Sequence, residues 1–205
     1  MRVAAAILAG GRATRLGGAR KPLLTVGGAR IVDRQLPVLR PLCDEVVLLS
    51  GDPAYAALEL RQIPDLRPGL GPLAGLEAAL AALDADAVLL VGGDMPTLAP
   101  PLLARLVADA PEADAVAAVI GGRPQPLPAR FHRRTLPRAR ALLDRGDRAL
   151  RTLLTELSWT PIDEATVRSL DPALGTFANV NTPGELARLD ALAVSPPFAP
   201  AGRSR

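Results

Sequence analysis

Short apolar runs alternate with segments of helical periodicity along most of the chain, and this alternation limits the possible folds more than any other feature. It favours an α/β architecture in which helices connect the strands of a largely parallel sheet. We expect strands near residues 3–8, 45–50, 87–91, 115–120 and 159–162. We expect helices near residues 31–42, 73–83, 101–109, 135–143, 149–156 and 183–192. The proline-dense residues 121–130 are expected to form an irregular crossing between these elements.

The composition excludes several classes of protein. Of the 205 residues, 49% are apolar and 22% are charged, which excludes general disorder. Basic and acidic residues are interspersed and aromatic residues are scarce, so we expect no nucleic-acid partner. Cys43 is the only cysteine and cannot form an internal disulfide. No apolar run approaches the roughly 20 residues of a membrane span, and no signal peptide is visible. We therefore expect a cytoplasmic protein without a membrane partner, with one domain over residues 1–193 and a flexible tail over residues 194–205.

Glycines and polar residues follow the expected strands at the points where parallel sheets bind ligands. Gly10 and Gly11 come directly after the first strand, and Asp94 follows the strand near residues 87–91. Asn179 and Asn181 stand in a third turn, later in the chain. Because ligands of open parallel sheets bind outside the carboxyl ends of the strands, we expect these residues to line one site.

Residue types that are otherwise absent from the chain mark the same segments. Lys21 is the only lysine, and Asn179 and Asn181 are the only asparagines, in a chain rich in arginine and alanine. The glycine turn can bring backbone N–H groups close to an anion, and Arg15 and Lys21 add two cations. This arrangement predicts a triphosphate site, and the alternative is a glycine-rich surface turn with solvated basic residues.

The same segments carry a resemblance to a known family. Residues 8–24, with Leu-Ala-Gly-Gly, Arg15 and Lys-Pro-Leu-Leu, resemble the signature of nucleotidyltransferases that activate sugars, isoprenoid precursors and pterins. Residues 71–76, 125–127, 146–148 and 177–186 are similar to segments of the molybdenum cofactor guanylyltransferases. The resemblance extends from residue 8 to residue 189. It implies a Rossmann-like three-layer sandwich of the nucleotide-diphospho-sugar transferase type.

The resemblance also implies an activity: transfer of GMP from GTP to the terminal phosphate of molybdopterin, with release of pyrophosphate. The catalytic residues would be Lys21, Arg15 and Asp94, with the two cations on the phosphates. Asp94 would be the ligand of Mg²⁺, which needs only one or two protein carboxylates, and it could also cap a helix. The N-terminal half would bind the nucleotide and the C-terminal half the acceptor. Other proteins of molybdenum cofactor biosynthesis, or acceptor enzymes, are candidate partners.

Two sets of binding residues follow from the resemblance. The expected nucleotide-binding residues are Leu8, Ala9, Gly10, Gly11, Lys21, Ser50, Asp65 and Asp94. The expected acceptor-binding residues are Asn179, Asn181 and Gln125. Asp65 corresponds to an acidic residue that contacts the guanine nucleotide, and Ser50 is a weaker candidate for a base contact. Asn181 or Thr182 could also cap a helix that begins at Pro183, with Glu185 completing a capping box.

Three rival interpretations stay open at this point. They are a cytidylyltransferase, a sugar-phosphate nucleotidyltransferase, and a non-catalytic module that binds the nucleotide or pterin and delivers it. The choice among GTP, CTP and UTP separates the enzymes, and replacing Asp94 by alanine separates an enzyme from a delivery module. The chain departs from the family at Arg20, where aspartate or proline is common, and at Gly184, where glutamate is common.

Overall fold

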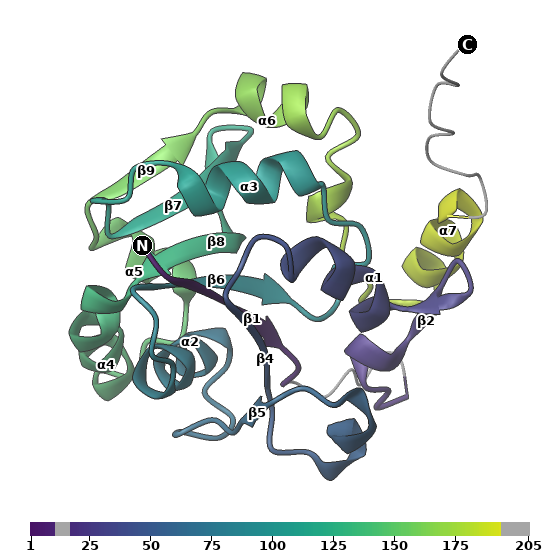
Figure 1. Cartoon of the computed structure of the whole chain (residues 1–205), viewed down its shortest axis with the longest axis horizontal. Helices are drawn as coiled ribbons and strands as arrows, with labels where there is room; N and C mark the ends of the chain where they lie inside the picture. The colour runs from purple at the N-terminus through teal and green to yellow at the C-terminus, as the bar shows by residue number, and fades with distance from the viewer. Residues whose placement is uncertain (11–16, 194–205) are drawn as a thin grey trace.

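The computed structural model describes residues 1–10 and 17–193. Within these residues, seven strands form one sheet in the order β5-β4-β1-β6-β8-β7-β9 (Figure 1). The strands are β1 (Val3–Leu8), β4 (Glu45–Leu49), β5 (Gln62–Ile63), β6 (Ala87–Gly92), β7 (Ala115–Ile120), β8 (Arg123–His132) and β9 (Trp159–Ile162). β8 runs antiparallel to β6 and β7, and the other neighbouring pairs of this sheet are parallel. The expected mostly parallel sheet is confirmed.

Helices cover both faces of this sheet, which makes three layers (Figure 1). On one face lie α2 (Pro72–Ala82), α4 (Leu136–Asp144) and α5 (Leu150–Thr155); on the other lie α1 (Ile31–Leu39), α3 (Pro100–Ala108) and α6 (Glu164–Leu170). Successive strand residues point to opposite faces. In β1, Ala4 and Ala6 pack against the first set of helices, and Val3, Ala5 and Ile7 pack against the second. The expected three-layer sandwich is therefore present.

The order of the strands creates a crevice beside β1. β1 pairs with β4 on one side and with β6 on the other, so the chain changes direction across the sheet at this strand. The register places Leu8, the last residue of β1, opposite Gly92, the last residue of β6. Ligands of open α/β sheets bind at such a switch point, outside the carboxyl ends of the strands.

A smaller unit packs beside the sheet. β2 (Thr25–Val26) and β3 (Ala29–Arg30) form a short hairpin, and α7 (Pro183–Ala193) lies next to it (Figure 1). Val26, Ile31 and Val180 form its buried core. The backbone N–H of Gly27 also donates to Asp190 Oδ1 at 2.6 Å. This contact holds the end of the chain's described part close to the segment that follows Lys21.

The sequence did not predict the short strands β2, β3 and β5, and two larger parts of the chain also differ from the expectation. The expected irregular crossing at residues 121–130 is wrong, because these residues form most of β8 after a tight turn in which Gly121 and Gly122 have φ of 57° and 70°. Pro126 and Pro128 lie where the register with β7 shifts, between the pairs Ala118–Gln125 and Ala117–Ala129, whereas Pro124 stays paired with Val119. The helix α6 was not expected, although Asp163 caps it by accepting from the N–H of Thr166 at 2.8 Å.

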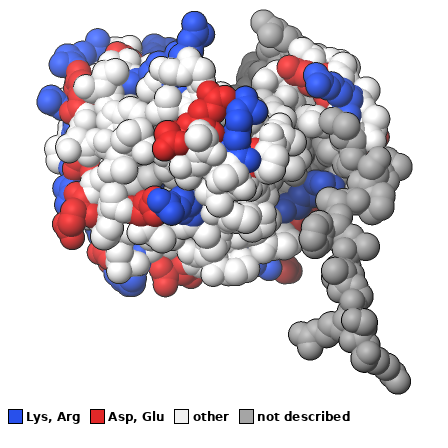
Figure 2. All heavy atoms as spheres, turned by 90° about the horizontal axis from the view of Figure 1, so that it is seen from above, with Lys and Arg blue, Asp and Glu red and all other residues white. Residues whose placement is uncertain are grey.

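The surface shows acidic and basic side chains close together on the face that Figure 2 presents. Among the described residues, many acidic and basic side chains form ion pairs, such as Arg67 with Asp144 and Arg145 with Glu156. In the part of the chain that the structure describes, no helix has the length and the apolar character that crossing a bilayer requires.

Candidate functional site

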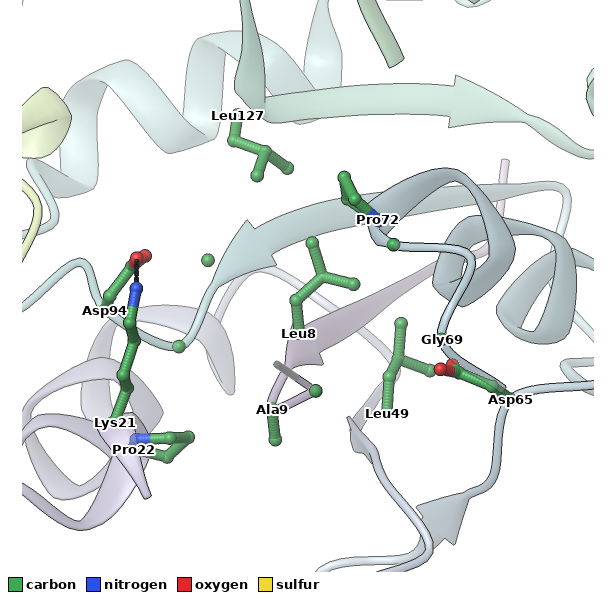
Figure 3. Close-up of a pocket in the computed structure, with 14 residues that line it drawn as sticks. Leu8, Ala9, Lys21, Pro22, Leu49, Asp65, Gly69, Pro72, Asp94 and Leu127 are labelled. Carbon is green, nitrogen blue, oxygen red and sulfur yellow. Dashed lines mark hydrogen bonds and ion pairs between the residues drawn. The ribbon is translucent and has the colours of Figure 1, made fainter. Parts of the chain in front are cut away.

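A cavity of about 340 Å³ opens at the carboxyl ends of β1 and β6. This volume lies within the range of small-molecule sites, roughly 300–1,000 Å³. Its lining consists of Leu8, Ala9, Gly10, Lys21, Pro22, Leu49, Asp65, Gly69, Gly71, Pro72, Gly92, Gly93, Asp94 and Leu127 (Figure 3). Segments far apart in the sequence thus meet around one space, and six of the expected nucleotide-binding residues are among them.

A cation, a carboxylate and an amide meet at one end of this cavity. Lys21 begins the 3-10 helix η2 (Lys21–Leu23), and its Nζ donates to Asp94 Oδ2 at 2.8 Å. The same Nζ donates to Asn181 Oδ1 at 2.6 Å. The Lys21 and Asp94 side chains are 24% and 20% exposed, so both can be reached from the cavity. The arrangement can receive an anion next to Lys21 and a cation next to Asp94.

The turn after β6 brings Asp94 to this position. The backbone N–H of Gly93 donates to Leu8 O at 2.9 Å, so the turn lies directly on the end of β1. A Cβ at Gly93 would lie 2.5 Å from Leu8 O and 2.7 Å from Pro22 Cγ. Both distances are too short for any side chain, and only glycine allows the segments of Leu8, Lys21 and Asp94 to approach this closely.

The asparagine segment is tied to the same turn. The backbone N–H of Val180 donates to Asp94 O at 2.9 Å. Glu185 Oε2 accepts from the N–H groups of Asn181 and Thr182, both at 2.9 Å, and Thr182 Oγ1 accepts from the N–H of Glu185 at 3.2 Å. These hydrogen bonds, first that from Asn181, lower the pKa of Glu185. Thr182 and Glu185 therefore form the capping box of α7, and the Asn181 side chain stays available to Lys21.

Asp65 lies at the opposite end of the cavity from the ion pair, across Leu8 and Leu49 (Figure 3). Burial raises the pKa of its carboxyl group, and no charge or hydrogen bond from the described residues opposes that rise. A carboxylate in a cavity without a protein partner is unfavourable unless a ligand supplies donors. The cavity thus has a charged end suited to phosphates and a second end that accepts hydrogen bonds.

The other expected residues occupy less direct positions. Ala9 lines the cavity, but its N–H donates to Leu49 O at 3.2 Å and its carbonyl accepts from Tyr55 Oη at 3.3 Å, so its amide is not free for an anion. Ser50, Gln125 and Asn179 do not line the cavity. Ser50 Oγ accepts from the N–H of Asp52, Gln125 Nε2 donates to Arg123 O, and Asn179 is exposed. Gly11 and Arg15 lie outside the described residues.

Several contributors were missed by the sequence-based reasoning. Leu49, the last residue of β4, and Gly69, in the loop after Asp65, line the cavity without having been singled out. Gln35 of α1 is fully buried and donates to the carbonyls of Gly92 and Met95, on either side of Asp94. Its signal in the sequence was a polar residue on the apolar stripe of an amphipathic helix.

The site fits a divalent metal of the kind that phosphate-transfer sites use. The described residues contain no group of three or more His, Cys, Asp or Glu side chains that could hold a metal by themselves. Mg²⁺ at such sites is bound by one or two carboxylates, with waters and substrate phosphates as its other ligands. Asp94, a partly exposed carboxylate at the cavity, provides that kind of ligand.

Comparison with known proteins decides the family. The family model described as the MobA-like NTP transferase domain matches residues 5–162. The chain belongs to this family. The chain is also similar to the Molybdenum cofactor guanylyltransferase of Rhodobacter capsulatus: the two are 36% identical over 197 residues, which cover 93% of this chain and 96% of the relative. The resemblance that the sequence motifs indicated is confirmed, and so is an enzyme of the nucleotidyltransferase class.

Solved structures agree with the fold of MobA-like NTP transferases. The Molybdopterin-guanine dinucleotide biosynthesis protein A from Archaeoglobus fulgidus has a TM-score of 0.79 and 26% identity, over 92% of this chain and 97% of that one. A Mycobacterium tuberculosis protein, solved in complex with manganese, has a TM-score of 0.63 and 19% identity, over 93% and 99% of the two chains. The second likeness concerns the fold alone. A divalent ion is therefore recorded in a protein with the fold of this chain.

Proposed function

We propose that this chain transfers GMP from GTP to the terminal phosphate of molybdopterin and releases pyrophosphate. The observation that carries the proposal is the cavity with two unlike ends: Lys21 against Asp94 and Asn181 at one end, and the unpartnered carboxylate of Asp65 at the other. Family membership and the named relative supply the substrate class.

The charged end is suited to the reacting phosphates. A terminal phosphate oxygen of the pterin forms the new bond to the α-phosphorus of GTP, and the bond from that phosphorus to the bridging oxygen of pyrophosphate breaks. The attacking phosphate is already ionised at neutral pH, so the step needs no strong general base. Lys21 would bind the phosphate oxygens as a point charge, and Asn181 holds its Nζ in place. Catalysis of this kind depends on positioning and on stabilising charge.

Asp94 would hold Mg²⁺ beside Lys21. The ion would neutralise phosphate charge and favour departure of pyrophosphate. Arg15, which belongs to the expected catalytic set, would add a second cation on the leaving phosphates. Because Lys21 and Asp94 contact each other, both groups can act on phosphates that enter the same end of the cavity.

The other end of the cavity would select the base. Guanine presents an N1–H and an exocyclic amino group on one edge, and a carboxylate can accept from both. Asp65 offers such a carboxylate, free of competing protein donors among the described residues. Cytosine and uracil lack this pair of donors, so the contact would favour GTP. Ser50 is further from the cavity and is the weaker candidate for a base contact.

The acceptor would approach from the side of the asparagine segment. Asn181 is directly bonded to Lys21, which makes it the best supported of the expected acceptor-binding residues. Asn179 is exposed two residues earlier, on the segment that Val180 ties to Asp94. Gln125 lies on β8, two residues before Leu127, which lines the cavity. On this proposal the N-terminal half binds the nucleotide and the C-terminal half binds the acceptor.

The test is incubation of the protein with Mg²⁺, a nucleoside triphosphate and molybdopterin, with detection of the dinucleotide product and of pyrophosphate. We expect product with GTP, and product with CTP alone would overturn the guanylyl assignment. Asp94→Ala should abolish turnover and leave pterin binding measurable. If that variant keeps its full biological activity, the chain acts as a delivery module and not as an enzyme. Cytoplasmic location and a partnership with other molybdenum cofactor proteins stay predictions, which cell fractionation and co-purification can test.

A further inference from the structure

A buried side chain of α1 forms hydrogen bonds with the backbone of the turn that carries Asp94. Gln35 is 0% exposed, and its Nε2 donates to Gly92 O at 2.8 Å and to Met95 O at 2.9 Å. These two carbonyls bracket Gly93 and Asp94 in the sequence. One amide nitrogen thus closes the turn at both ends, without itself lining the cavity.

The chemistry of the contact explains why an amide stands at this position. Two carbonyl acceptors that face one side chain require two N–H hydrogens, and a primary amide supplies both from one atom. Gln35 Oε1 is buried and has no hydrogen-bond partner among the described residues. A buried polar atom without a partner opposes folding. Gln35 therefore supplies donors to two carbonyls of the turn while its own Oε1 stays without a donor. This arrangement favours a fixed position of the turn over a fully hydrogen-bonded Gln35 side chain.

The neighbouring residue extends the same connection towards Lys21. Arg34 Nε donates to Pro96 O at 3.1 Å, and its Nη1 donates to Val26 O at 3.1 Å. Val26 belongs to the hairpin that follows Lys21, and Pro96 follows the Asp94 turn. Helix α1 therefore joins the two segments whose side chains meet at the charged end of the cavity.

We infer that Gln35 is a positioning residue: its buried amide fixes the Asp94 turn so that the carboxylate is held where a divalent cation and phosphates meet it. Gln35 touches neither substrate nor metal in this role and acts through Asp94. The inference rests on the metal-binding role proposed for Asp94.

The decisive variant is Gln35→Met, which keeps the length of the side chain and removes both donors. Its matched control is Thr135→Val. Thr135 is 1% exposed and donates from Oγ1 to His132 O at 2.8 Å. His132 pairs with Ala87 at the amino end of β6, the end opposite to Gly92, so the control removes a buried donor far from the cavity. If Gln35→Met does not fold, Gln35→Asn, which keeps the amide but shortens the side chain by one methylene, replaces it with the same expectation.

Two properties are measured on each folded variant. The first is the affinity for Mn²⁺, by electron paramagnetic resonance with a GTP analogue that has a methylene between the α- and β-phosphorus atoms. The second is the kinetics of the transfer, given by kcat and KM. Loss of groups that orient a metal ligand typically lowers metal affinity or activity about 10–100-fold. We expect Gln35→Met to weaken Mn²⁺ binding about tenfold or more and to lower kcat similarly, with KM for GTP changed less than kcat. Thr135→Val should leave both within about twofold of the wild type.

Asp94→Asn separates the inference from the proposed function. If Asp94→Asn binds Mn²⁺ as tightly as the wild type, the proposed role of Asp94 fails and the inference fails with it. If Asp94→Asn loses Mn²⁺ but Gln35→Met keeps wild-type Mn²⁺ affinity and kcat, only the inference is overturned, and Gln35 is a purely structural residue. Equal losses in Gln35→Met and Thr135→Val would overturn it as well, because they would show a general effect on folding.

Discussion

Replacing Gly93 by alanine tests whether the close meeting of three segments is a requirement of the site. The added Cβ would lie 2.5 Å from Leu8 O and 2.7 Å from Pro22 Cγ. Leu8 O belongs to the backbone of the central strand and also accepts the N–H of Gly93, so it cannot rotate away as a flexible side chain would. The turn that carries Asp94 must therefore move away from β1 and from the segment of Lys21.

The size of the expected effect follows from these distances. Carbon and oxygen atoms of this kind do not normally approach within about 3 Å, so the turn must shift by at least about 0.5 Å, which is the tolerance of a catalytic constellation. A misplacement of about 1 Å can reduce activity about a hundredfold. We expect kcat/KM for the transfer to fall roughly tenfold to a hundredfold. The overpacking should also lower the free energy of unfolding by about 1–3 kcal/mol.

The assay is pyrophosphate release from Mg²⁺-GTP with molybdopterin as acceptor, under conditions where urea titration shows the variant to be fully folded. Gly184→Ala is the matched control, because a Cβ at Gly184 would have no heavy atom within 4 Å. It adds the same methyl group in α7, where alanine is the better helix former. The reasoning is refuted if Gly93→Ala, fully folded, retains activity within about twofold of Gly184→Ala.

Four further predictions, from three perturbations, concern the two ends of the cavity. Asp65→Asn should raise KM for GTP roughly tenfold to a hundredfold, the value of hydrogen bonds to a charged group, and nucleotide competition would contradict this if GTP kept its advantage over CTP. Burial raises the pKa of Asp65 in the folded state, so the folded state binds the proton more tightly than the unfolded state, and the free energy of unfolding falls as pH rises from the unfolded pKa to the folded pKa. Urea unfolding should therefore show Asp65→Asn to be more stable than the wild type at neutral pH. This advantage should disappear below about pH 3.9, the pKa of an unfolded aspartate. Lys21→Met should lower kcat about 100- to 1,000-fold. Lys21→Arg should restore little of this kcat, because the planar guanidinium cannot replace the compact ammonium between Asp94 and Asn181. A kcat of Lys21→Arg within threefold of the wild type would instead show that any positive charge at this position is sufficient. Chelation with EDTA should stop turnover and Mn²⁺ should restore it, and turnover that survives exhaustive chelation would contradict the role proposed for Asp94.

Much of the fold could be predicted because the buried strands are apolar and are bounded by glycine or proline. β1 and β7, which are followed by Gly10 and Gly121, occupy the residues expected of them, and α2 begins at the proline that follows Gly71. β9 also occupies its expected residues, although it is only partly buried and no glycine or proline bounds it. The error at β8 has a physical reason: Pro124, Pro126 and Pro128 remove backbone donors and conceal the strand signal. The Gly121-Gly122 pair between two runs was the signal that could have revealed a hairpin.

The candidate site was predictable to a different degree at each of its positions. Lys21, Asp94 and Asn181 are marked by rarity, by glycines or by their place after a strand, and the structure brings their side chains into contact. Leu49 carried no such mark, since a leucine at the end of a buried strand is ordinary. Gln35 falls on the buried stripe that Ile31 and Leu39 also form, where a polar residue is unusual. A polar residue at a position where the helical pattern calls for an apolar one is thus the signal by which the sequence indicates a positioning residue such as Gln35.

The backbone contacts around the site explain why the sequence motifs that identify the site consist largely of glycines and turn residues. The carbonyl of Leu8 accepts from Gly93, and the carbonyl of Asp94 accepts from Val180, so main-chain groups join three distant segments. The side chain of Lys21 thereby contacts those of Asp94 and Asn181, and Lys21 and Asp94 line the cavity. A substitution that keeps all of these side chains but separates the backbones should thus lower activity clearly, although less than the loss of Lys21 or Asp94. This is why the Gly93 variant, which removes no functional group, tests the architecture of the site more directly than a variant that removes a charge.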